Sequence, residues 1–282
     1  MRPHQWVKNL FVLVPIVFSK GLTDFERVDH ALIAFASFCL AASSIYLLND
    51  LIDVEADRAH PKKRSRPIAS GMVPTNVARG AFGVLAIGSV GLATAVGAGV
   101  AAVVASYLAL NVAYTFGLKR VAYVDVLCIA TGFELRVLAG MLAVDAAMST
   151  YLLVVTFALA SFLGFGKRMH EFIQGEGVEA QRSVLRHYRA RPLKLLMILN
   201  GVVTIVAYVL ATLDPTNVVY FGSNRLAFTT VFTAFGIIRF VRLVSYRPEA
   251  ESPTEEMLRD KPFLLNIVAW FIAVVVTVYV HR

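Results

Sequence analysis

The chain has little charge and almost no cysteine. Only 16% of its 282 residues are Asp, Glu, Lys or Arg, whereas 57% are hydrophobic. This composition excludes an ordinary soluble globule, which needs more polar residues to cover its surface, and it predicts a membrane protein with several spans. The two cysteines, Cys39 and Cys128, both lie in apolar stretches, which argues against a disulfide framework.

The formal net charge is +8. A basic balance is typical of nucleic-acid partners, but here the Lys and Arg residues alternate with apolar runs of membrane length. We therefore interpret the charge as a signal of membrane topology and expect no nucleic-acid partner.

Nine apolar segments are long enough, or nearly so, to cross a hydrocarbon core of roughly 30 Å. We expect an all-α polytopic membrane protein of about nine transmembrane helices that form a single domain over residues 1–282. The predicted helices span about 7–22, 30–52, 77–97, 99–118, 122–144, 150–167, 193–213, 225–244 and 262–280. The first is the shortest and contains Pro15.

Basic residues gather on one side of this arrangement. With the N-terminus in the cytoplasm, the Lys and Arg residues fall on the cytoplasmic side or at its edge, apart from Lys20, Arg27, Arg136, Arg225 and Arg282. This asymmetry follows the positive-inside rule. It predicts that the long, charged loops face the cytoplasm and that any water-soluble partner is bound from that side.

A dense acidic motif ends the second predicted helix. The stretch "NDLIDVEAD" places Asn49, Asp50, Asp53 and Asp57 in the pattern N-D-x-x-D-x-x-x-D. On a helix the three aspartates share one face, while Glu55 points elsewhere. Carboxylates this close repel one another unless a cation intervenes, and their oxygens suit Mg²⁺. The alternative is a charged helix end whose acids pair with the following cations.

Cations follow the acids directly in "HPKKRSRPIASG". Next to a metal-binding face, Arg64 and Arg66 are candidate ligands for a diphosphate, although the positive-inside rule alone also accounts for such a block. Further candidates are Tyr114 and Lys119 at the end of the fourth helix, and Lys167, Arg168 and Glu171 in "FGKRMHEF". Membrane anchoring and a simple ion pair that closes a helix are the alternatives for these two groups.

Asp125, Glu134 and Arg136 lie within the fifth predicted helix. Because such residues are costly in lipid, they must face the bundle interior or a polar cavity. At the N-terminus, Trp6 and Lys8 are typical of membrane anchoring at an interface, and the alternative places Lys8 and Asn9 at the edge of that cavity.

Taken together, these motifs resemble the UbiA superfamily of intramembrane prenyltransferases, which have nine transmembrane helices and an aspartate-rich first motif. "NDLIDVEAD" and "RPIASG" carry the resemblance. Typical members have a second aspartate-rich motif after the sixth helix, whereas this chain has the basic "GKRMHEFIQGEG" there. With "RPHQWVKN" and "YTFGLK", this departure resembles the decaprenyl-phosphate phosphoribosyltransferase branch, which acts in cell wall biosynthesis.

The resemblance implies a membrane-embedded glycosyltransferase. It implies Mg²⁺-dependent transfer of 5-phosphoribose from phosphoribosyl diphosphate to a polyprenyl phosphate of the decaprenyl type, with release of diphosphate. Asp50, Asp53 and Asp57 would hold the metal, with Asn49 beside them. Asp50, Asp53 and Lys119 would act in catalysis, Lys167 and Arg168 would hold the 5-phosphate, and Lys8 would assist either phosphate group. The resemblance also implies an integral protein of a bacterial inner membrane whose polar cavity and active site face the cytoplasm. The bilayer supplies the lipid, and the oligomeric state stays open.

Three other functions are alternatives. A UbiA-type prenyltransferase that moves a prenyl group from its diphosphate to an aromatic acceptor shares the acidic motif but differs at the basic segment around Lys167. A transporter or lipid flippase needs a path to both faces of the membrane, whereas the charges here gather at one. A non-catalytic scaffold leaves the aligned aspartates unexplained.

Overall fold

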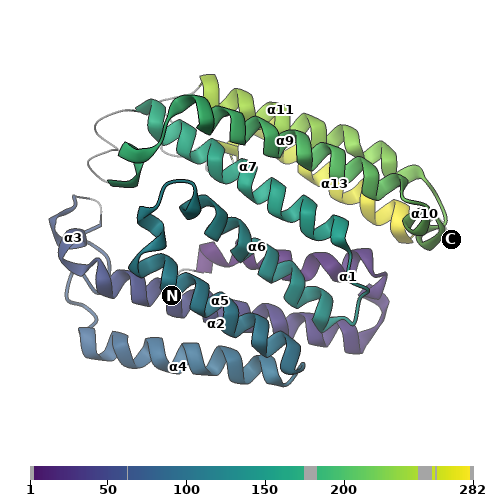
Figure 1. The fold of residues 1–282 in the computed structure, drawn as a ribbon. Helices are drawn as coiled ribbons and strands as arrows, with labels where there is room; N and C mark the ends of the chain where they lie inside the picture. The colour runs from purple at the N-terminus through teal and green to yellow at the C-terminus, as the bar shows by residue number, and fades with distance from the viewer. Residues whose placement is uncertain (1–2, 62, 175–182, 247–255, 258, 280–282) are drawn as a thin grey trace. The chain divides into compact units, whose positions relative to one another are not determined.

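The computed structural model describes residues 3–61, 63–174, 183–246, 256–257 and 259–279. All regular secondary structure in this part of the chain is helical, which confirms the all-α prediction (Figure 1). Internal contacts divide the chain into two compact units. Unit 1 comprises residues 1–116 and 135–147, and unit 2 comprises residues 117–134 and 148–282.

Eight helical segments within the described residues are long and apolar enough to cross a membrane. A shorter apolar helical segment, Gln5–Phe18, precedes them, so the predicted number of about nine is confirmed. The eight are α2 (Phe25–Ile52), α4 (Thr75–Thr94), α5 (Ala98–Phe116), α6 (Val124–Ala143), α7 (Thr150–Gln174), α9 (Ala190–Leu213), the segment Arg225–Val244 formed by η5 (Arg225–Thr229) with α11 (Thr230–Tyr246), and α13 (Lys261–Tyr279).

Several predicted boundaries differ from the structure, and the differences in the first helix and in α7 have a clear physical reason. The first predicted helix is a long 3₁₀ segment, η1 (Pro3–Leu13), followed by the short α1 (Val14–Phe18). Pro15 lies in the first turn of α1, where a missing backbone N–H costs no hydrogen bond. Helix α7 continues to Gln174, about two turns beyond the predicted end, because Met169 and Phe172 still pack on an apolar core.

Unit 1 is built on α2, which packs extensively against α4 and also contacts α5 and η1. Asp24 starts α2, since its side chain accepts the backbone N–H groups of Glu26 and Arg27. The core combines Phe38 and Tyr107 with small residues such as Ala34 and Ala41, which let helices approach closely.

Unit 2 is built on α7 and α9, which pack along much of their length (Figure 1). Its core contains Phe162 from α7 and Phe240 from α11, whose rings meet edge to face with centroids 5.0 Å apart. The short helix α10 (Pro215–Phe221) begins with its N–H groups capped by Asp214 and ends at Gly222, whose φ of +75° is left-handed.

Candidate functional site

The acidic motif forms a cluster around one arginine in unit 1. The Nη1 atom of Arg66 lies 3.2 Å from Oδ1 of Asp50 and 2.6 Å from Oδ2 of Asp57. The Asp57 side chain is buried and that of Asp50 is largely buried, whereas the Arg66 side chain is 27% exposed to solvent. The structure therefore places Asp50, Asp57 and Arg66 in direct contact, with the guanidinium between the two carboxylates.

A break in the helix shapes this cluster. Helix α2 ends at Ile52, Asp53 caps it, and the short helix α3 (Val54–Ala59) carries Asp57. The predicted helix end at residue 52 agrees with the structure, and the three aspartates do not lie on one unbroken helix. Asp57 still lies one turn beyond Asp53, because its backbone N–H donates to the Asp53 carbonyl oxygen at 2.8 Å.

Neighbouring side chains hold the cluster in place. The hydroxyl of Thr115 on α5 donates to Oδ1 of Asn49 at 2.8 Å, which joins α5 to the end of α2. Nε of Arg58 donates to the carbonyl oxygen of Ala69 at 3.1 Å, which joins α3 to the following segment. Ile68 and Ala69 are buried in that segment, so the backbone around Arg66 is fixed by packing as well.

These residues suit a divalent cation that is shared with a substrate. Among the residues that the structure describes, no group of three or more His, Cys, Asp or Glu side chains is arranged to hold a metal ion. Asp50 and Asp57 nevertheless converge on a single positive nitrogen. Mg²⁺ commonly binds through one or two carboxylates together with substrate phosphates, so this pair of carboxylates fits the requirement.

The basic residues after the motif are not all drawn into the cluster. Arg66 reaches the acids, whereas Arg64 is exposed and Lys63 is partly buried. Lys62 lies outside the described residues. Arg64 and Arg66 are the two arginines of this stretch that were predicted as substrate ligands, and Arg66 is the one that contacts the acidic motif.

The N-terminal segment is tied to α2 by three side-chain hydrogen bonds. They join Tyr46 to Gln5 at 3.5 Å, Trp6 to Ser43 at 3.2 Å and Asn9 to Cys39 at 3.3 Å. The segment η1 and the second half of α2 therefore run antiparallel. Lys8 is exposed on η1, whereas Asn9 is completely buried.

Arg136 on α6 is buried within unit 1. Its Nε donates to Oδ1 of Asn9 at 2.8 Å, and its Nη2 donates to the Tyr107 hydroxyl at 3.0 Å. The guanidinium carbon also lies 4.6 Å from the Tyr107 ring centroid and 5.6 Å from that of Phe38. The prediction that Arg136 faces the interior is confirmed, and aromatic faces are part of what stabilises its charge there.

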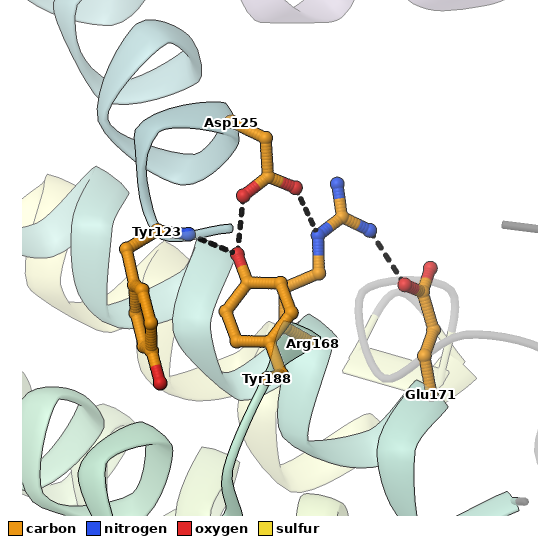
Figure 2. A network of polar contacts seen from close by, with 5 residues as sticks. All are labelled: Tyr123, Asp125, Arg168, Glu171 and Tyr188. Atoms are coloured by element: carbon orange, nitrogen blue, oxygen red, sulfur yellow. Dashed lines mark hydrogen bonds and ion pairs between the residues drawn. The ribbon is translucent and has the colours of Figure 1, made fainter. Parts of the chain in front are cut away.

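A second polar network lies in unit 2 (Figure 2). Nε of Arg168 on α7 donates to Oδ2 of Asp125 on α6 at 2.7 Å, and Nη1 donates to Oε2 of Glu171 at 2.5 Å. The other Asp125 oxygen accepts a short hydrogen bond from the Tyr188 hydroxyl, which in turn accepts the backbone N–H of Tyr123 at 2.9 Å. The predicted substrate ligands Arg168 and Glu171 are thus partners of each other, and Arg168 is held between two carboxylates.

Tyr188 is the member of this network that the sequence did not reveal. It follows η4 (Ser183–His187) in a basic stretch without apolar periodicity, and nothing local distinguishes it from its neighbours. Burial is the main reason why its pKa is raised above the usual tyrosine value, and the hydrogen bond to Asp125 adds to the effect. Tyr188 therefore stays protonated at neutral pH and donates to the Asp125 carboxylate.

The remaining predicted ligands are partly buried residues in different elements. Tyr114 lies near the end of α5 in unit 1, Lys119 lies in η3 (Leu118–Arg120) of unit 2, and Lys167 lies on α7 next to Arg168. Their roles in substrate binding stay predictions.

Comparison with known proteins agrees with the fold and the motifs. A model of the UbiA prenyltransferase family matches residues 11–259. The chain belongs to the UbiA prenyltransferase family. The decaprenyl-phosphate phosphoribosyltransferase of Mycolicibacterium smegmatis is 35% identical over 99% of this chain and 91% of its own length. That of Corynebacterium glutamicum is 34% identical over 99% of this chain and 86% of its own length.

A solved UbiA homologue from Archaeoglobus fulgidus, bound to GPP and Mg²⁺, superposes on this UbiA-family chain with a TM-score of 0.76. The match covers 98% of this chain and 97% of the homologue, at 15% identity, and it establishes the fold. Together with the eight apolar spans, these matches identify an integral membrane transferase.

Proposed function

We propose that this UbiA-family chain transfers 5-phosphoribose from phosphoribosyl diphosphate to a polyprenyl phosphate and releases diphosphate. The observation that carries the proposal is the similarity, over nearly its whole length, to relatives named for a phosphoribosyltransferase reaction on decaprenyl phosphate. The reaction requires a site for a leaving diphosphate and a separate site for the 5-phosphate. The acidic cluster around Arg66 supports the first of these.

Asp50 and Asp57, with Asp53 at the helix break, are the residues that would hold Mg²⁺. Once bound, Mg²⁺ supplies positive charge that neutralises the departing diphosphate. The A. fulgidus structure with Mg²⁺ supports a divalent metal in the family. The carboxylates of Asp50 and Asp57 already converge on one cationic centre, so they need little rearrangement to receive another.

The cations divide into two roles. Arg66 and Lys8 are candidates for direct contact with phosphate oxygens, since Arg66 keeps part of its exposure and Lys8 is exposed. Lys119 and Lys167 are retained as phosphate ligands from the sequence motifs. Arg168 is assigned a positioning role, because its guanidinium is buried and held by Asp125 and Glu171.

The acceptor needs no strong general base. A polyprenyl phosphate is already ionised at neutral pH, and one of its oxygens forms the new bond to C1 of the ribose while the C1–diphosphate bond breaks. Attack from the face opposite the leaving group converts the α-linked donor into a β-linked product. The protein contributes orientation and charge neutralisation to this step.

The proposal is tested with protein purified in detergent, Mg²⁺, radiolabelled phosphoribosyl diphosphate and a polyprenyl phosphate. Label is expected to enter the lipid fraction. Transfer should stop when the metal is chelated and should resume when Mg²⁺ is restored. Asp50→Asn should reduce the rate at least about a hundredfold, since the metal would lose a principal ligand. Glu55→Gln is the matched control, because Glu55 is an exposed acid in the same segment.

A different outcome would favour the other donor class. If no label reaches the lipid while a prenyl diphosphate and an aromatic acid react, the chain is a conventional UbiA prenyltransferase.

The proposed location, a bacterial inner membrane with the active site toward the cytoplasm, is tested by adding the donor to sealed inverted vesicles. Product should form without permeabilisation.

A further inference from the structure

A group of unpaired basic side chains, four Lys or Arg and one His, surrounds the start of α9 in unit 2. The stretch "RHYRARPLK" contains Arg186, His187, Arg189, Arg191 and Lys194, and all five side chains are exposed. Within the described part of the chain, none of the five makes an ion pair or a side-chain hydrogen bond. An exposed cluster of one sign without protein counter-ions favours an anionic ligand.

This cluster contains an open pocket of about 450 Å³. The pocket is lined by Tyr123, His187, Arg189, Pro192 and Leu196. The lining therefore combines basic side chains with apolar surface. A phosphate headgroup joined to a hydrocarbon chain requires this combination.

Tyr123, which lines the pocket, has an unusual backbone conformation. Its φ is +69°, a left-handed value that bulky residues rarely adopt. The Tyr188 hydroxyl accepts its backbone N–H, and the two rings meet edge to face with centroids 4.8 Å apart. Because Tyr188 is fixed by Asp125, the buried network of Figure 2 also determines the shape of the pocket.

The length of α9 and the charges in its first turn suit a position of the pocket at the level of the lipid headgroups. Helix α9 has 24 residues and is a membrane-span candidate. At 1.5 Å per residue it is about 36 Å long, so its first turn extends beyond a hydrocarbon core of ~30 Å. Directly after the cations, Leu195, Leu199 and Val202 are exposed at helical spacing, which gives an apolar strip for a lipid chain.

We infer that this pocket binds the phosphodiester headgroup of an anionic bilayer phospholipid, with Arg189 and His187 at the phosphate and the lipid chain along α9. None of the residues that line this pocket belongs to the acidic cluster, and the inference does not depend on which donor the enzyme uses. Charge complementarity and the neighbouring apolar strip are the reasons for choosing a phospholipid as the occupant.

Native mass spectrometry of the full chain in detergent tests the inference, with phosphatidylglycerol as the probe and phosphatidylcholine as the zwitterionic reference. Wild-type protein is expected to retain phosphatidylglycerol preferentially. Arg189→Gln should weaken this binding about fivefold or more, the effect of one cation at a membrane surface. Arg191→Gln is the matched control, because it removes the same charge two residues away and does not line the pocket. It should change binding less than about twofold.

Two outcomes would overturn the inference. Equal weakening by Arg189→Gln and Arg191→Gln would mean that lipid is attracted by diffuse surface charge and not by the pocket. Displacement of phosphatidylglycerol by an equimolar amount of polyprenyl phosphate would assign the pocket to the acceptor substrate. Because both arginines are exposed, each variant should keep the wild-type thermal midpoint, and this is checked in the same samples.

Discussion

Arg168 and Asp125 form a buried ion pair, with the arginine Nε 2.7 Å from the carboxylate oxygen and both side chains almost inaccessible to solvent. The residues lie on α7 and α6, and their pairing joins these helices within unit 2. Glu171 and Tyr188 complete the environment of the pair. A charge with these partners is better suited to fixing a helix end than to binding and releasing a substrate.

Arg168→Met is therefore expected to destabilise the protein by about 3–5 kcal/mol, because the Asp125 carboxylate would stay buried without its counter-ion. The measurement is the thermal midpoint of the detergent-purified protein. Arg120→Met, which removes an exposed arginine of η3 in the same unit, serves as the control and should have little effect. If Arg168→Met instead keeps its midpoint and only raises the KM for the donor, Arg168 is a substrate ligand and the positioning role fails.

The two polar networks show what the sequence can and cannot predict. The span positions follow from apolar length, a local property, and the structure confirms them to within a few residues at most ends. Asp125 and Arg136 were expected inside the protein because charge is costly in lipid, and both are buried. Their partners lie far along the chain: Arg168 is 43 residues from Asp125, and Asn9 is 127 residues from Arg136. Such pairings depend on tertiary packing.

The acidic motif illustrates the same distinction. The spacing of Asp50 and Asp57 correctly predicted that the two residues lie near one another. Their shared partner, Arg66, belongs to the block of cations that follows. The choice of Arg66 over Arg64 depends on the turn between α3 and α4, which the burial of Ile68 and Ala69 fixes. No spacing rule for helices applies to that turn.

Arg66 and a bound cation should compete for the same carboxylate oxygens. In Arg66→Gln, Asp50 and Asp57 lose their shared counter-ion, so Mg²⁺ is expected to raise the thermal midpoint more in the variant than in the wild type. The transfer rate should nevertheless fall about tenfold or more, because a charged hydrogen bond to phosphate is lost. Arg64→Gln is the matched control. Equal Mg²⁺ shifts in wild type and Arg66→Gln would contradict a cation site at these acids.

Arg136 provides a test of the buried cation in unit 1. Arg136→Lys keeps the charge but not the planar group that reaches Asn9 and Tyr107 together, so the two cannot both keep their hydrogen bonds. We expect a loss of about 1–2 kcal/mol, since polar interactions between membrane helices are of modest strength. The thermal midpoint is again the measurement, with Arg79→Lys on the exposed part of α4 as the control. A midpoint equal to that of the control would mean that the hydrogen bonds to Asn9 and Tyr107 contribute nothing.

Gly140 determines how closely η1 packs against α6. A Cβ atom at this position would collide with the backbone carbonyl oxygen of Val12 and would lie 3.0 Å from the Pro15 ring. Because a backbone atom cannot rotate away as a side chain does, Gly140→Ala should displace η1 and cost about 1–3 kcal/mol. Gly83→Ala is the matched control, since Gly83 is also helical and a Cβ there meets no atom within 4 Å. A shifted η1 would carry Lys8 with it, so Gly140→Ala should also lower the transfer rate in protein that is still folded at the assay temperature. If both alanine variants have the same midpoint and rate, the close contact at Gly140 does not position the N-terminal segment.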